Sequence, residues 1–182
     1  MKNQSITEAM LQFIEESPTA FHAAANVEAL LLENGFEKLE NLAEGALVPG
    51  GSYYTMQNGS AVLAVKIPEN PAKGFRIAAS HSDSPCFKIK EVPEMKVENT
   101  YVKLNVEKYG GMILSPWLDR PLSVAGRVFV AGKDGKPEVK LVNLKKDLLI
   151  IPNVAIHFNR EINNGFAYNP QTDMAPLMGL DQ

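Results

Sequence analysis

The sequence lacks several features that would assign it to a particular class of protein. It has one cysteine, Cys86, so no disulfide can form within the chain, which suits a reducing compartment. Its first residues contain no apolar segment typical of secretion signals, and no hydrophobic run approaches the roughly 20 residues of a membrane helix. The 18 Lys and Arg against 21 Asp and Glu are not the basic excess of nucleic-acid-binding proteins. These absences predict a cytoplasmic protein without membrane or nucleic-acid partners.

The chain has enough apolar material for a packed core, and its first part is predicted to be helical. Of its 182 residues, 45% are hydrophobic and 21% are charged, as in ordinary globular domains. Ser5 and Glu8 have the spacing of a capping box, which predicts a first helix. Thr19 can cap a second helix over 20–33, and Gly35 supplies a stop. We expect both helices to be packing elements.

From residue 52 the pattern becomes that of β-strands. Residues 52–56 and 60–67 are rich in β-forming residues and flank Asn58-Gly59, a pair that accepts the positive φ values of a type I′ turn. This predicts a hairpin. A second hairpin with a longer loop is predicted from 122–130 and 138–144.

Further strands are predicted less directly, from short apolar or alternating runs. These strands are 75–80, 87–90 and 95–106. Residues 148–158 are apolar but contain Pro152, which suits a strand edge or a bulge. After residue 34 no segment resembles a long amphipathic helix, although a mostly parallel α/β sheet needs helices on both faces. We therefore expect the sequence to be a piece of a longer protein, with a domain boundary near 90–95.

The segment of greatest chemical interest follows the predicted strand 75–80. His81 and Asp83 lie two residues apart, and in an extended chain such residues point to the same face. A neutral imidazole is a good zinc ligand, and a nearby carboxylate can fix the tautomer and orientation of the ring. Since H-x-D is a short motif, the spacing alone also fits a hydrogen-bonded His–Asp pair in an ordinary loop.

Several segments, taken in order, resemble the aspartyl aminopeptidase family of zinc metallopeptidases, and together they cover most of the chain. They are Ser17-Pro18-Thr19-Ala20-Phe21-His22-Ala23, Gly35-Phe36, His81-Ser82-Asp83-Ser84-Pro85, Tyr109-Gly110-Gly111-Met112, Trp117-Leu118-Asp119-Arg120-Pro121-Leu122, Ala125-Gly126-Arg127-Val128 and Ile151-Pro152-Asn153-Val154-Ala155-Ile156-His157-Phe158-Asn159-Arg160. The family usually has threonine at the position of Ser82, a change that leaves the ligand geometry intact.

The resemblance implies an α/β fold in two parts. Residues 1–92 would form the N-terminal part of a catalytic zinc-peptidase domain, with a mixed sheet between helices. Residues 93–182 would form part of a β-rich dimerisation domain, inserted into the first, through which a homo-oligomer assembles. The rest of the catalytic domain, with most of the metal ligands, would lie beyond this sequence.

The resemblance also implies a metalloaminopeptidase that hydrolyses N-terminal residues, acidic ones by the family name, from peptide substrates with two zinc ions per complete site. His81 matches the position of a zinc ligand, and Asp83 matches the residue that orients it. His157 matches a histidine that the inserted domain presents to a neighbouring subunit's active site, to hold the substrate or to stabilise the reacting carbonyl oxygen. The general base and the remaining ligands have no counterpart here, so residues 1–182 are expected to be inactive alone.

A different class of function stays open, namely a non-catalytic assembly module in which the β-rich segment makes subunit contacts and the H-x-D motif is vestigial. Other chemically notable residues are interpreted as structural. They are His22 as a helix-borne structural histidine, Trp117 as a core or interface anchor, Asp119-Arg120 as a buried ion pair or a contact that fixes the fold, and Cys86 as a small buried residue. Without the resemblance, His157 would be interpreted as a core or interface histidine.

Overall fold

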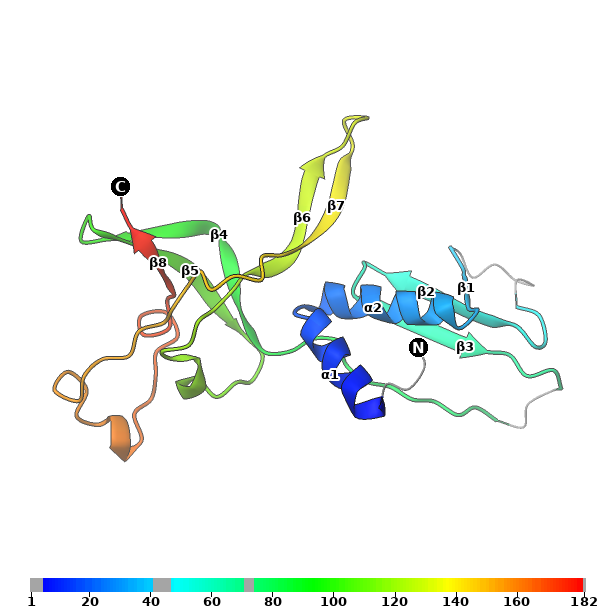
Figure 1. Ribbon diagram of the computed structural model, residues 1–182, viewed down its shortest axis with the longest axis horizontal. Helices are drawn as coiled ribbons and strands as arrows, with labels where there is room; N and C mark the ends of the chain where they lie inside the picture. Colours follow the sequence, from blue (N-terminus) through cyan, green and yellow to red (C-terminus); the bar gives the residue numbers. More distant parts are fainter. Residues whose placement is uncertain (1–4, 41–46, 71–73, 182) are drawn as a thin grey trace. The chain divides into compact units, whose positions relative to one another are not determined.

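The computed structural model describes residues 5–40, 47–70 and 74–181, and their fold is mixed α/β with small sheets, as expected (Figure 1). The chain divides into two compact units. Unit 1 combines Met1–Asp83 with Ala125–Val142, and unit 2 combines Ser84–Val124 with Asn143–Gln182. The assignment of 1–92 to a catalytic domain and 93–182 to a dimerisation domain stays a prediction.

Unit 1 begins with two helices whose starts are fixed by side-chain caps. Helix α1 (Ile6–Glu16) follows Ser5, whose hydroxyl accepts from the Glu8 N–H at 3.2 Å, while the Glu8 carboxylate accepts from the Ser5 N–H at 2.9 Å. Helix α2 (Ala20–Glu33) follows Thr19. Both predicted helices and their caps are confirmed. In the described ranges, no helix is both long and apolar enough to cross a bilayer.

A three-stranded sheet in the order β1–β2–β3 follows the helices. Strands β2 (Ser52–Gln57) and β3 (Ala61–Lys66) form the predicted hairpin. The turn residues Asn58 and Gly59 have φ values of 54° and 68°, the left-handed values that a type I′ turn needs. Strand β1 (Glu37–Lys38), which the sequence did not indicate, pairs with β2 in parallel.

The second predicted hairpin is confirmed and also belongs to unit 1. It consists of β6 (Ala125–Ala131) and β7 (Pro137–Asn143). Arg127 attaches it to the first hairpin, since its Nη1 donates to the backbone oxygen of Asn58 at 2.8 Å. The same guanidinium lies over the Phe21 ring of α2, 4.1 Å from the centroid, in a cation–π contact.

Unit 2 contains a sheet in the order β4–β5–β8, formed by Cys86–Val97, Tyr101–Tyr109 and Leu177–Leu180. The prediction of one strand over 95–106 is wrong, because Glu98 and Asn99 turn the chain with φ values of 54° and 49°. Asparagine often takes positive φ but glutamate seldom does, so Glu98-Asn99 lacks the Asn-Gly pattern that indicates the first hairpin. Two short 3₁₀-helices, Ser115–Trp117 and Ile162–Asn164, lie in the connections. The core gathers Leu104, Val106 and Leu149, with Phe87, Leu122 and Val124 packed against it.

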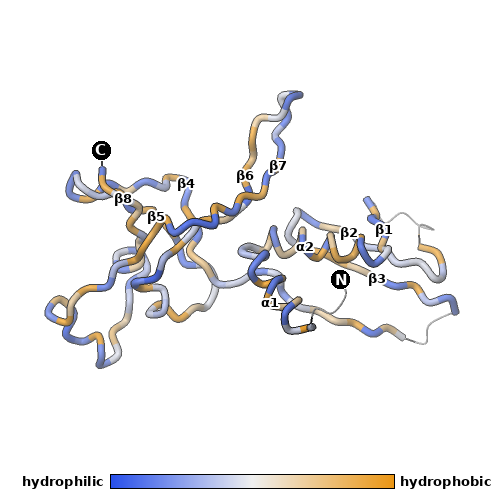
Figure 2. Tube along the Cα trace, viewed as in Figure 1, coloured by the Kyte–Doolittle hydropathy of each residue, from blue (hydrophilic) through white to orange (hydrophobic). Residues whose placement is uncertain are grey.

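The predicted strand 75–80 is not formed. Within the described residues 74–85 the backbone pairs with no other strand, and Phe75 and Ile77 are 89% and 85% exposed. Figure 2 shows the hydrophobic residues of this segment, which follows β3, in orange. A strand exists through hydrogen bonds to a neighbour, and the described chain supplies no neighbouring strand here. The apolar run is therefore not a buried strand in this structure.

The segment 148–158 also differs from the predicted strand edge or bulge. Its first residues make only isolated bridges, in which Leu149 pairs with Leu122 and Ile151 with Leu118. Pro152 has no N–H to donate, and the N–H of the next residue, Asn153, donates to the Asp119 carboxylate at 2.9 Å. Pairing therefore stops at this point, and the rest of the segment forms turns.

Candidate metal centre

The H-x-D motif places an imidazole and a carboxylate in direct contact. His81 Nδ1 lies 2.7 Å from the backbone oxygen of Asp83 and 3.1 Å from its Oδ1. The contact expected from the two-residue spacing is therefore present, although the segment is not part of a strand. The His81 side chain is 82% exposed.

This contact fixes which ring nitrogen is open to a ligand. A backbone carbonyl oxygen can only accept a hydrogen bond, so Nδ1 of His81 carries a proton and donates it toward Asp83. In the neutral ring, Nε2 then holds the free lone pair. An imidazole whose Nδ1–H is held by a carboxylate and whose Nε2 is open is the usual arrangement of a zinc-binding histidine. His81 and Asp83 thus fit one position of a zinc site.

The described part of the chain gathers only part of a donor set for such an ion. Among the residues that the structure describes, no three or more His, Cys, Asp or Glu side chains come together in a way that could hold a metal. Catalytic zinc is usually held by three protein ligands and a water. His81 would therefore need ligands beyond those gathered here.

His157 belongs to unit 2 and lies in a turn rather than at the end of a strand. Two successive turn hydrogen bonds surround it, from Phe158 N–H to Ala155 O at 2.8 Å and from Asn159 N–H to Ile156 O at 3.2 Å. Its side chain is exposed. The turn therefore presents an imidazole to the surroundings of unit 2.

The residues interpreted as structural are largely local anchors. His22 Nδ1 lies 2.8 Å from the Thr19 hydroxyl, and burial lowers the pKa of its imidazole. Asp119 accepts a hydrogen bond from the Asn153 N–H and so fixes its loop, as the predicted fold-fixing contact requires. Asp119 is exposed, so the alternative prediction of a buried ion pair with Arg120 is wrong. In unit 2, Trp117 packs edge-to-face on Phe87, with the ring centroids 5.1 Å apart. Cys86, also in unit 2, is half-buried.

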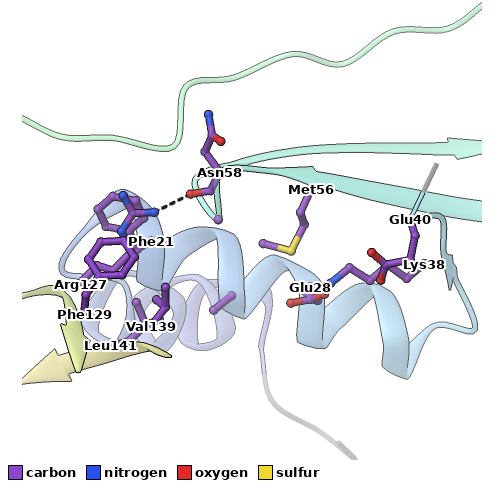
Figure 3. Close-up of a pocket in the computed structure, with 12 residues that line it drawn as sticks. Phe21, Glu28, Lys38, Glu40, Met56, Asn58, Arg127, Phe129, Val139 and Leu141 are labelled. Atoms are coloured by element: carbon purple, nitrogen blue, oxygen red, sulfur yellow. Dashed lines mark hydrogen bonds and ion pairs between the residues drawn. The ribbon is translucent and has the colours of Figure 1, made fainter. Parts of the chain in front are cut away.

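Unit 1 also contains a cavity of about 670 Å³ over α2, shown in Figure 3. Its apolar wall includes Phe21, Met56 and Phe129. Glu28 and Lys38 lie at one end, and the second end carries Arg127 with its bond to Asn58 (Figure 3). The sequence did not indicate this arrangement, because Arg127 and Asn58 are 69 residues apart.

The charged end of the cavity is built on a shared carboxylate oxygen. Lys38 Nζ lies 2.8 Å from Glu28 Oε1, and the Tyr54 hydroxyl donates to the same oxygen at 3.0 Å. The hydrogen bond from Lys38 lowers the pKa of Glu28, and the same bond raises the pKa of Lys38. Burial, followed by the bond to Glu28, raises the pKa of Tyr54. These contacts join α2, β1 and β2.

This carboxylate gives a prediction for the pH dependence of stability. Because the pKa of Glu28 is lower in the folded state, its contribution is present above its ordinary value of 4.5 and is lost as the pH falls through the folded-state pKa. We expect Glu28→Gln to cost about 1 kcal/mol at pH 7 and less at pH 3, as measured by urea unfolding across this range. The control is Glu33→Gln, an exposed position on the same helix, whose free energy of unfolding should change with pH as that of wild type does. An equal cost of Glu28→Gln at both pH values would contradict the assignment.

Comparison with known proteins adds an independent line of evidence. The sequence model of the family described as aminopeptidase I zinc metalloprotease (M18) matches residues 13–182. A probable M18 family aminopeptidase 2 of Clostridium acetobutylicum is 47% identical over 184 residues, which cover 99% of this chain and 42% of that protein. The chain thus spans less than half the length of this relative.

Solved structures agree with this match. A structure of the Ape4 and Nbr1 complex superposes with a TM-score of 0.88 and 36% identity, over 96% of this chain and 34% of that one. The S. cerevisiae mApe1 dodecamer superposes with a TM-score of 0.79 and 25% identity, over 96% of this chain and 38% of that one. The match over residues 13–182 and the identity along nearly the whole sequence lead to one conclusion: the chain belongs to the M18 family of zinc metalloproteases.

Proposed function

We propose that the protein is a zinc-dependent aminopeptidase and that this chain contributes His81 to its metal site. The observation that carries the proposal is the His81 ring itself, whose Nδ1 is engaged by Asp83 and whose Nε2 is open, in a chain of the M18 family. Its substrates would be peptides with a free N-terminus. Following the family resemblance, we propose a preference for an N-terminal Asp or Glu.

The roles of the two residues follow from their contact. His81 would hold the ion through Nε2, and Asp83 would keep the proton on Nδ1 and the ring plane fixed. When bound, zinc supplies a coordinated water of lowered pKa and polarises the scissile carbonyl. We propose two ions in a complete site.

The rest of the machinery would come from polypeptide that matches the remaining length of the relatives. This chain covers 42% of the C. acetobutylicum protein, and the described part gathers fewer than three metal donors at any point. We propose that the remaining ligands and a glutamate general base, which takes the proton of the attacking water, lie in that other part. Residues 1–182 alone would then be inactive.

We further propose that the active protein is a homo-oligomer assembled through the β-rich segment 93–182. The S. cerevisiae mApe1 structure is a dodecamer, which supports this assembly. His157, exposed on its turn, is proposed to reach the active site of a neighbouring subunit and to bind the substrate or its carbonyl oxygen there. A cytoplasmic location is proposed from the single cysteine.

Hydrolysis assays on the full-length protein test this proposal. Asp-, Glu- and Leu-p-nitroanilide should be compared before chelation, after removal of metal with a chelator, and after zinc is added back. We expect turnover that is lost on chelation and restored by zinc, with the acidic substrates preferred. Failure to hydrolyse any aminoacyl substrate in a zinc-loaded oligomer would contradict the enzyme and favour the assembly module.

A further inference from the structure

Ser82 lies between His81 and Asp83, and its side chain makes a contact of its own. The Ser82 hydroxyl donates to the backbone oxygen of Ser60 at 2.8 Å. The Ser82 bond and the His81–Asp83 contact are present together, because they are made by different side chains. The hydroxyl thereby joins the H-x-D segment to a part of the chain 22 residues earlier.

The acceptor of this bond lies on a turn that is itself held in place. Ser60 closes the β2–β3 turn through its N–H, which donates to Gln57 O at 3.2 Å. Asn58, at the centre of the turn, accepts from Arg127 of β6 at 2.8 Å. The type I′ geometry at Asn58 and Gly59 further restricts the turn. Ser60 therefore offers a fixed point to which the H-x-D segment can be tied.

The segment before His81 has little else in the described chain to hold it. Residues 74–80 form no strand pairing, and Phe75 and Ile77 are almost fully exposed. A ligand on a loosely held segment must lose conformational freedom when it binds, which weakens affinity. A bond that orders the segment beforehand removes part of that cost.

We propose that Ser82 is a positioning residue for His81, in that its bond to the β2–β3 turn holds the imidazole ready for the metal. This role rests on the proposed zinc site. Ser82 touches neither metal nor substrate, and it acts by fixing the backbone that carries His81. A hydrogen bond of ordinary strength corresponds to a change in zinc affinity of about threefold to tenfold.

The test compares zinc dissociation constants of full-length variants by competition with a chelating dye. We expect Ser82→Ala to bind zinc about threefold to tenfold more weakly with an unchanged melting temperature, because the Ser82 bond is exposed and outside any core. Ser82→Thr keeps the hydroxyl and should restore wild-type affinity. The control is Ser84→Ala, an exposed serine two residues further on, which should bind like wild type.

A second readout follows the segment without any metal. In the metal-free protein, Ser82→Ala should speed amide hydrogen exchange at residues 81–83, and Ser82→Thr should not. Equal zinc affinity of Ser82→Ala and wild type, or a Ser82→Thr protein as weak as Ser82→Ala, would overturn the role of Ser82 and leave the zinc site standing. A wild-type protein that binds no zinc would overturn the proposed function and this role together.

Discussion

Replacing His81 with alanine in the full-length protein is expected to lower its zinc content and to reduce aminopeptidase turnover by more than about 100-fold. The reason is that even loss of a residue that only orients a ligand costs 10- to 100-fold in metal affinity or activity, and His81 is proposed as the ligand itself. Zinc per protomer, measured by atomic absorption after gel filtration, and kcat/KM on aminoacyl p-nitroanilides check this expectation.

The chain provides matched variants for this experiment. His22→Gln removes another of the three histidines, one on helix α2 that contacts the N-cap residue Thr19, and it should retain wild-type zinc content. Asp83→Asn should fall between His81→Ala and wild type, because it weakens the hold on Nδ1 and leaves Nε2 in place. If His81→Ala kept the zinc content of wild type, His81 would not be a ligand of the metal site.

Residues 1–182 alone are expected to show no aminopeptidase turnover and only millimolar affinity for zinc. A complete four-ligand structural zinc site is worth about 10–16 kcal/mol, so one imidazole of four supplies roughly a quarter of this. A quarter is about 2.5–4 kcal/mol, which corresponds to a dissociation constant of about 1–15 mM. At such affinity the ion is not held at the micromolar concentrations of an assay, so the coordinated water is missing.

Calorimetric titration of zinc into residues 1–182, with the same chain carrying His81→Ala, measures this contribution. We expect a small heat of zinc binding for residues 1–182 and a smaller one for the same chain with His81→Ala. Neither should release p-nitroaniline from the aminoacyl substrates. Chelator-sensitive hydrolysis by residues 1–182 would show that this chain holds enough ligands for catalysis, against the proposed division of the site.

Features that depend on neighbouring residues could be predicted from the sequence. The capping pair Ser5 and Glu8, the Thr19 cap and the Asn58-Gly59 turn each act within four residues, and each is present in the structure. The His81–Asp83 contact is of the same kind, because its geometry follows from a spacing of two residues.

Features that depend on distant partners could not be predicted in this way. The run 75–80 has the composition of a buried strand, but a strand needs a neighbour, and composition does not say whether one is present. The Glu98-Asn99 turn was not predicted because Asn99 is not followed by glycine and glutamate is rare at positive φ. In the site, the bonds of Ser82 to Ser60 and of Arg127 to Asn58 join residues 22 and 69 positions apart.

Anomalous diffraction at the zinc edge, from crystals of the complete protein, is the most direct test of the claim that His81 is a metal ligand. We predict an anomalous peak about 2.0–2.1 Å from His81 Nε2, with Nδ1 still directed at Asp83. A zinc peak coordinated by other residues, with the His81 ring turned away from it, would contradict the account.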